Sequence, residues 1–222
     1  MLELKKIKYH PATALNPILT DVNISVNKGT PLVIAGASGS GKSSLIEIIS
    51  GLSKPQHGYI RFQGKIASER KRRSISGVVF QFPERHFIGL TVLEELRLGH
   101  RRLASDKIDE TLTKVGLSSL ILKSPPENLS GGQQRRLAIA VQLTRNPSIL
   151  LLDEPTAGLD WSVRDEIIKV IKDLSSNIIL IVVTHEPQIF QDSKISSYQL
   201  NNGRLIKTIQ PHKTKEPPCQ TN

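Results

Sequence analysis

The five residues LSGGQ occupy positions 129–133 and form the most specific pattern in this chain of 222 residues. Residues 133–144 follow with strong helical periodicity, and the adjacent pair Arg135 and Arg136 lies near the start of this helical segment. A flexible serine–glycine linker is therefore a poor alternative. Upstream, residues 36–43 read GASGSGKS, a glycine-rich pattern to which the LSGGQ stretch adds specificity. These two stretches together decide the expected fold.

Residues 36–43 match the pattern GxxxxGK[ST] of phosphate-binding loops. Apolar residues 32–35 precede the loop and helical residues 45–49 follow it, so a plain glycine-rich turn is disfavoured. Glycines let backbone N–H groups curl around the β-phosphate, Lys42 adds a positive charge, and the Ser43 hydroxyl can ligate Mg²⁺. The residues that we assign to nucleotide binding here are Gly36, Ala37, Ser38, Gly39, Ser40, Gly41, Lys42, Ser43 and Ser44.

Asp153 and Glu154 follow the apolar residues 149–152, at the carboxyl end of an expected strand. Ligands bind at this edge in open α/β sheets. Asp153 is suited to hold Mg²⁺ through water, and Glu154 is suited to polarise an attacking water as general base. Adjacent carboxylates after a strand could instead cap the following helix.

These motifs, joined by Gln81 and His185 in a fixed order, resemble the nucleotide-binding domain of the ATP-binding cassette (ABC) family over about residues 2–209. Residues 153–160 read DEPTAGLD and match the family pattern DEPTxGLD, which argues against the capping role. The resemblance implies that Gln81 senses Mg²⁺ and that His185 contacts the γ-phosphate and orients Glu154. Without the other motifs, a lone histidine or glutamine after a strand would be read as a packing or capping residue.

The resemblance also implies a head-to-tail dimer that buries two ATP molecules. In the family, LSGGQ caps the γ-phosphate held by a second ATPase subunit, so the expected assembly is a homodimer or a heterodimer. The residues expected on this surface are Ser130, Gly131, Gly132, Gln133 and Asp160. Tyr9 matches the aromatic residue that stacks on adenine, although an aromatic on an edge strand is common for structural reasons.

Short β-branched runs alternate with helical segments, which predicts an α/β fold. We expect a P-loop NTPase (RecA-like) core with an antiparallel β subdomain and an inserted α-helical subdomain at about residues 86–145. The ABC ATP-binding domain should span residues 1–210, and residues 211–222 should form a disordered tail. The expected strands are residues 2–9, 18–26, 32–35, 58–62, 78–80, 149–152 and 178–183, with a helix at 162–174 and a closing hairpin that turns at Asn202 and Gly203.

The formal net charge is +10, and the densest basic cluster is RKRR at residues 70–73. We interpret this cluster as an exposed basic loop, because no aromatic residue that could stack on a base is interleaved with it. No specific nucleic-acid partner is expected, and attraction to acidic head groups is the minority interpretation. The only cysteine, Cys219, excludes an internal disulfide.

The longest aliphatic run, residues 178–183, falls far short of the roughly 20 apolar residues of a membrane span. The first residues also lack the apolar stretch of a secretory signal. We therefore expect a cytoplasmic protein that lies peripherally on the cytoplasmic face of a membrane.

The segment after Gln81, as far as Gly99, looks like that of ATPase subunits of energy-coupling factor transporters and their plastid and cyanobacterial relatives. This similarity implies an ATP-hydrolysing subunit that couples dimer closure to import through an integral membrane subunit. Arg85 and His86 replace the acidic or amide residues expected there, so the membrane partner and the substrate stay open. The alternative is a soluble ABC ATPase that acts in assembly, repair or translation. A P-loop small-molecule kinase would leave LSGGQ and His185 without a role.

Overall fold

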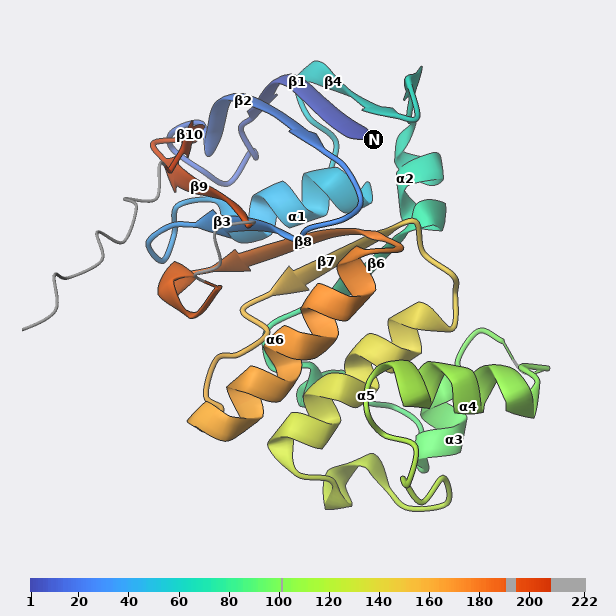
Figure 1. The fold of residues 1–222 in the computed structure, drawn as a ribbon. Coiled ribbons are helices and arrows are strands. Elements are labelled where there is room, and N and C mark those ends of the chain that lie inside the picture. The colour runs from blue at the N-terminus through green and yellow to red at the C-terminus, as the bar shows by residue number, and fades with distance from the viewer. Residues whose placement is uncertain (101, 191–194, 209–222) are drawn as a thin grey trace, which may run out of the picture.

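The computed structural model describes residues 1–100, 102–190 and 195–208, whose ribbon is drawn in Figure 1. The strands are β1 (Leu2–Tyr9), β2 (Leu19–Val26), β3 (Leu32–Ala35), β4 (His57–Phe62), β5 (Lys65–Ile66), β6 (Ser76–Val79), β7 (Ile149–Asp153), β8 (Ile179–Thr184), β9 (Ser196–Asn201) and β10 (Arg204–Lys207). The α-helices are α1 (Lys42–Ser50), α2 (Glu69–Ile75), α3 (Val92–Leu96), α4 (Ser105–Lys114), α5 (Gly131–Leu143) and α6 (Trp161–Ser175). Three short 3₁₀ helices are η1 (Pro83–His86), η2 (Pro126–Asn128) and η3 (Pro187–Phe190).

The described strands form two sheets. The smaller sheet has the order β2-β1-β4-β5 and is antiparallel throughout. The larger has the order β10-β9-β3-β8-β7-β6, in which every pair except the β9–β10 hairpin is parallel. Because β3, β8, β7 and β6 run parallel to one another, their carboxyl ends meet at one edge, where open α/β sheets bind ligands.

Helix α1 lies between the two sheets (Figure 1). Alternate residues of a strand point to opposite faces, and the pleat of β7 divides the core accordingly. Ile149 and Leu151 pack with α1 and the small sheet, whereas Leu150 and Leu152 pack with the helices on the other face. This two-sided burial explains why β3, β7 and β8 are continuous apolar runs in the sequence.

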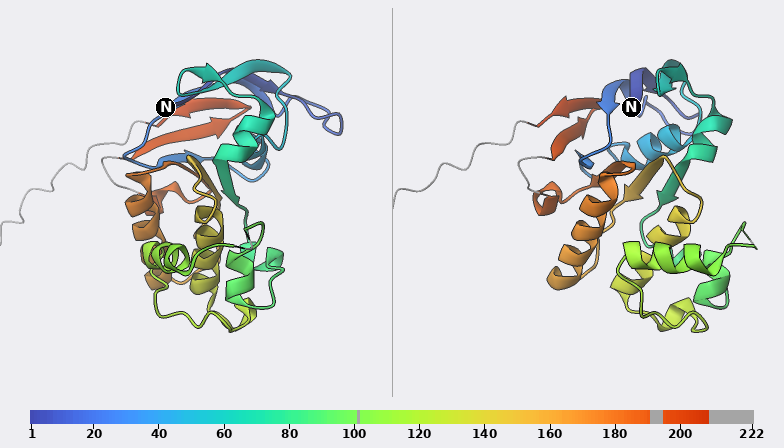
Figure 2. Two further views of the ribbon diagram at one scale, coloured as in Figure 1. Left: turned by 90° about the vertical axis from the view of Figure 1, so that its right-hand side faces the viewer. Right: turned by 45° about the vertical axis from the view of Figure 1, so that its right-hand side comes forward.

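Helices α3, α4, α5 and α6 lie on the side of the larger sheet away from α1, as the two further views in Figure 2 show. The first three of these come from the segment that we predicted to be an inserted helical subdomain at about residues 86–145, and that boundary stays a prediction. Among the described residues, no helix is long and apolar enough to cross a membrane.

One sequence-based expectation is wrong, and a second concerns residues that the structure does not describe. Residues 70–73 are not a loop, because α2 contains them and its N-cap Ser68 accepts a hydrogen bond from the Lys71 amide. Arg72 is buried against the end of α1 and donates to the Ala67 carbonyl, so the cluster is only partly an exposed basic surface. The disordered tail expected at 211–222 lies outside the described residues.

Candidate functional site

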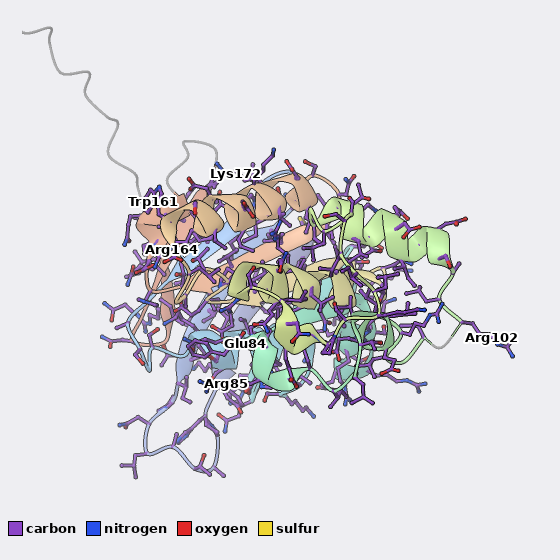
Figure 3. The ribbon with its side chains drawn as sticks, turned by 90° about the horizontal axis from the view of Figure 1, so that it is seen from below. Glu84, Arg85, Arg102, Trp161, Arg164 and Lys172 are labelled. Carbon is purple, nitrogen blue, oxygen red and sulfur yellow. The ribbon has the colours of Figure 1, made fainter. Side chains whose placement is uncertain are left out.

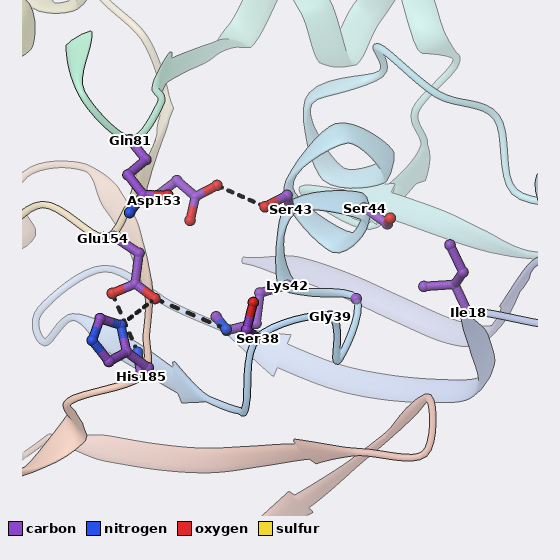
Figure 4. Close-up of a pocket in the computed structure, with 11 residues that line it drawn as sticks. Ile18, Ser38, Gly39, Lys42, Ser43, Ser44, Gln81, Asp153, Glu154 and His185 are labelled. Carbon is purple, nitrogen blue, oxygen red and sulfur yellow. Dashed lines mark hydrogen bonds and ion pairs between the residues drawn. The ribbon is translucent and has the colours of Figure 1, made fainter. Parts of the chain in front are cut away.

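The loop between β3 and α1 forms the wall of a cavity of about 520 Å³ (Figure 4). Gly41 adopts a φ of 97°, in the left-handed region that favours glycine, just before α1 begins. Gly36 is also constrained, because a Cβ there would lie 2.4 Å from the Ser40 hydroxyl oxygen. The loop thus keeps a tight curve that presents backbone groups at a helix N-terminus.

Lys42 is only 8% exposed, and its ammonium group donates to the Gly36 carbonyl at 2.8 Å and to the Ala37 carbonyl at 3.1 Å. A carboxylate oxygen of Glu154 lies 3.9 Å from the same nitrogen. A buried ammonium is stable only with such partners. These contacts hold the lysine at the loop, where its charge can serve an anion that enters the cavity.

Asp153, the last residue of β7, accepts a hydrogen bond of 2.9 Å from the Ser43 hydroxyl, although the two residues are far apart in sequence. Burial raises the pKa of the Asp153 carboxyl and Glu154 adds to the rise, whereas the Ser43 hydrogen bond and Lys42 oppose it. Gln81, just beyond the end of β6, lines the same cavity (Figure 4). Ser43, Asp153 and Gln81 therefore all line this one cavity.

Glu154 is 6% exposed and has a φ of 49°, which is unusual for a residue with a side chain. Its amide donates to the Val183 carbonyl of β8, and this bond holds the turn in place. The carboxylate accepts a hydrogen bond from the His185 amide at 3.2 Å and lies 2.9 Å from the His185 Nδ1 atom (Figure 4). Glu154 faces the cavity and does not cap α6, which begins seven positions later at Trp161.

Several predicted nucleotide-binding residues do not line this cavity: Gly36, Ala37 and Ser40 belong to its loop but not to its lining, and Tyr9 and Asp160 lie outside it. Tyr9 is half-buried at the end of β1 and does not line it, although its carbonyl accepts a hydrogen bond from the Ile18 amide. Ile18 itself lines the cavity, and no sequence signal pointed to it, because an apolar residue at the start of an expected strand is ordinary. Asp160 is exposed at the N-cap of α6, and its side chain makes no capping hydrogen bond.

The LSGGQ stretch is also outside the cavity. Ser130 is the N-cap of α5: its hydroxyl accepts from the Gln133 amide, and the Gln133 side chain accepts from the Ser130 amide at 2.9 Å. This reciprocal capping box fixes the first turn of the helix. Gly131 is exposed, whereas Gly132 packs against α6, where a Cβ would lie 2.3 Å from a methyl carbon of Val163. One chain therefore does not bring LSGGQ and the phosphate loop together.

A second hollow, of about 380 Å³, lies between β6, η1 and α5. Its lining is largely apolar and includes Val79, Phe80, Pro83, Phe87, Ala138 and Val141. The sequence marked the residues after Gln81 as a contact segment, but not the α5 wall, because α5 residues that face a groove look like ordinary core positions.

Comparisons with known proteins agree with this geometry. The family model described as ABC transporter matches residues 19–157. ABC transporter I family member 11, chloroplastic, of Arabidopsis thaliana is 37% identical over 95% of this chain and 81% of its own length. Energy-coupling factor transporter ATP-binding protein EcfA2 of Streptococcus pneumoniae is 35% identical over 95% of this chain and 81% of its own length.

Among solved structures, CbiO1 of Clostridium perfringens, described as part of the ABC transporter complex CbiONQ, superposes with a TM-score of 0.83 and 29% identity, over 92% of this chain and 86% of that one. The matched family model covers the phosphate loop and both carboxylates of the cavity. The chain therefore belongs to the ABC transporter family, as an ATP-binding ATPase domain.

Proposed function

We propose that this chain is the ATP-hydrolysing subunit of an energy-coupling factor-type importer and works with an integral membrane subunit. The observation that carries the proposal is the single cavity that joins Lys42, Ser43 and Asp153 to the Glu154–His185 pair. The names of the Streptococcus and Clostridium relatives support the transporter assignment.

In this proposal the phosphates of ATP lie along the loop, with Lys42 exchanging its carbonyl partners for phosphate oxygens. Ser43, Asp153 and Gln81 would hold Mg²⁺, because they bring oxygen ligands of the kind this cation prefers to one cavity. Only one of the three is a carboxylate, which suits an ion whose other ligands are water and substrate phosphates. When bound, Mg²⁺ supplies charge neutralisation on the β- and γ-phosphates.

Glu154 would act as general base on the water that attacks the γ-phosphate, and the proton would pass to its carboxylate. Two contacts with His185 hold the carboxylate of Glu154 in one orientation, and the hydrogen bond from the Glu154 amide to the Val183 carbonyl holds its backbone. A positioned general base contributes about 10²- to 10⁴-fold to a rate. His185, 53% exposed at its side chain, is free on its outer side to reach the γ-phosphate.

The LSGGQ residues would act on the ATP of a second subunit, because their own chain holds them away from its cavity. The capping box leaves the Gly131 and Gly132 amides at the first turn of α5 without intrahelical acceptors. Ser130, Gln133 and those amides would face the γ-phosphate in trans, Asp160 would lie at the seam between subunits, and Tyr9 would stack on adenine. The second subunit would be either a copy of this chain or a related ATPase.

The apolar groove between η1 and α5 would receive a segment of the membrane subunit. Its η1 wall directly follows Gln81, so a docked segment would touch the loop that reaches the cavity. This arrangement would place the chain on the cytoplasmic face of a membrane.

Trp161 offers a direct test of the dimer, because it is the only tryptophan, is 70% exposed and directly follows Asp160 (Figure 3). In Glu154→Gln, ATP with Mg²⁺ should double the mass seen by light scattering and change the fluorescence of Trp161, while hydrolysis falls by about 100-fold or more. Ser130→Arg should still bind ATP but neither dimerise nor hydrolyse. A monomer under all conditions, with unimpaired turnover in Ser130→Arg, would contradict the trans-acting role.

The transport role needs a separate measurement on the assembled complex. An integral membrane protein should co-purify with the wild-type chain from detergent extracts, and vesicles that hold the complex should import substrate only with ATP and an intact Glu154. A chain that purifies without any membrane protein and hydrolyses ATP at full rate would favour the soluble ABC ATPase instead.

A further inference from the structure

Arg135 is a buried cation whose hydrogen-bonding capacity is mostly unused. The side chain is 3% exposed, and only its Nη2 atom has a partner, the Ala157 carbonyl at 3.3 Å. Its Nε and Nη1 atoms are buried without an acceptor in the described part of the chain. Burying an arginine in this state is costly, since a buried charge normally has a hydrogen-bonded counter-ion.

Glu84 is the carboxylate whose charge acts on this guanidinium, although no ion pair joins them in this conformation. Burial lowers the pKa of Arg135, and Glu84 opposes that change. Glu84 belongs to η1, which packs against α5, and Figure 3 shows it on the underside of the molecule. A movement of η1 toward α5 that brings Glu84 to the guanidinium would give Arg135 the acceptor that it lacks.

The same guanidinium also contacts the turn that carries Glu154. Its partner Ala157 lies in the turn after the catalytic carboxylate, where the Ala157 amide donates to the Glu154 carbonyl at 3.1 Å. On the other side, Pro83 of η1 lines the apolar groove, together with Ala138, one helical turn after Arg135 on α5. Arg135 thus stands between the groove and the turn that carries Glu154.

We propose that Arg135 is a positioning residue: when a partner segment fills the groove, Glu84 pairs with Arg135, and the pair holds the turn of Ala157 and Glu154 in its active arrangement. This inference rests on the proposed function, because it requires a partner in the groove. In the free subunit the pair is open, which leaves the loop around Glu84 ready to respond to docking.

A double-mutant cycle in the assembled membrane complex tests this pairing. Glu84→Gln removes the carboxylate charge, and Arg135→Gln removes the cation but keeps a donor for the Ala157 carbonyl. The readout is partner stimulation, the turnover of the complex divided by that of the free subunit. Each single variant should lower it by at least about fivefold, and the double variant should lose no more than the worse single variant. Glu127→Gln, an exposed carboxylate in η2 outside the groove, is the matched control and should keep wild-type stimulation.

Thermal unfolding of the free subunit provides the second arm of the cycle. Because Glu84 and Arg135 are not paired in the free subunit, the stability changes of the two single variants should add in the double variant. Arg135→Met can replace Arg135→Gln if the latter does not fold. The proposal would be overturned if the two single losses of stimulation multiplied in the double variant. It would also be overturned if the stability changes of the two variants were already non-additive in the free subunit. A wild-type subunit that no membrane partner stimulates would refute the proposed function instead, so the two failures are distinct.

Discussion

Replacing Gly132 by alanine tests whether the LSGGQ glycines serve packing or anion contact, because the two glycines have opposite surroundings. A Cβ at Gly132 would lie 2.3 Å from a Val163 methyl carbon, whereas a Cβ at Gly131 would have its nearest contact, Leu159, at 3.5 Å. Carbon atoms pack optimally at roughly 3.5–4 Å, so α5 and α6 would have to move apart or Val163 would have to leave its preferred rotamer. Overpacking of this kind costs about 1–3 kcal/mol.

The expected result is a fall in Tm of roughly 2–12 °C for Gly132→Ala, at about 2–4 °C per kcal/mol for a chain of this size. Gly131→Ala should leave Tm unchanged or slightly raised, because alanine is the better helix former. Val163→Ala should rescue Gly132→Ala, since it removes the clashing methyl group. Calorimetry of the nucleotide-free proteins measures the Tm values that are compared. Equal Tm values for the two glycine variants, or a double variant with no rescue, would refute this account of the α5–α6 contact.

Three further predictions concern the cavity and the small sheet. Lys42→Ala should weaken ATP binding by at least about 30-fold in titration calorimetry, since a buried charge partner of the phosphates is lost. Asp153→Asn should stabilise the nucleotide-free protein by on the order of 1 kcal/mol at neutral pH, because burial opposes the charged carboxyl. The difference in stability between this variant and the wild type should shrink in mild acid, because the raised pKa lets Asp153 take up a proton in the folded state. A stability difference that stays constant across pH would contradict this prediction. Gly58→Ala should cost more stability than Gly64→Ala: both have a positive φ, but only at Gly58 would a Cβ meet backbone carbonyls of β1, at 2.4–2.5 Å.

The strands and the phosphate loop were predictable because their signals are local. β1 and β3 begin and end where the alternation and the apolar run predicted, and the hairpin turns at Asn202 and Gly203 as expected. The position of Asp153 at the carboxyl end of a strand followed from a general rule on open α/β sheets, whereas its hydrogen bond with Ser43 is a tertiary contact that the sequence analysis did not predict. The roles assigned to these residues stay predictions until variants are measured.

What the sequence missed depends on tertiary contacts. Helix signals directly precede the run at residues 70–73, namely an N-cap serine at 68 and the acidic Glu69 in the first turn, but the charge of the run suggested a solvated loop. Arg72, one of the four residues of the run, is buried because the left-handed Gly51 lets α2 pack closely on α1. The burial of Arg135 could not be predicted either, because the sequence of two adjacent arginines does not indicate which of them is buried. Arg136 is the one that reaches a carboxylate, that of Glu166 on α6 at 3.1 Å.

The geometry of α5 explains why ATP should act between subunits and not within one. The capping box ties Ser130 and Gln133 to each other, and Gly132 is wedged against Val163, so the first turn of α5 is fixed to α6. Helix α6 is in turn held near the turn that follows Glu154, because Arg164 donates to the Leu159 carbonyl and pairs with Glu186 at 3.0 Å. A rigid unit of this kind cannot fold back onto its own phosphate loop. In the proposed function a second subunit would therefore supply the LSGGQ surface, and the motion passed to the membrane subunit would be the approach of two such units.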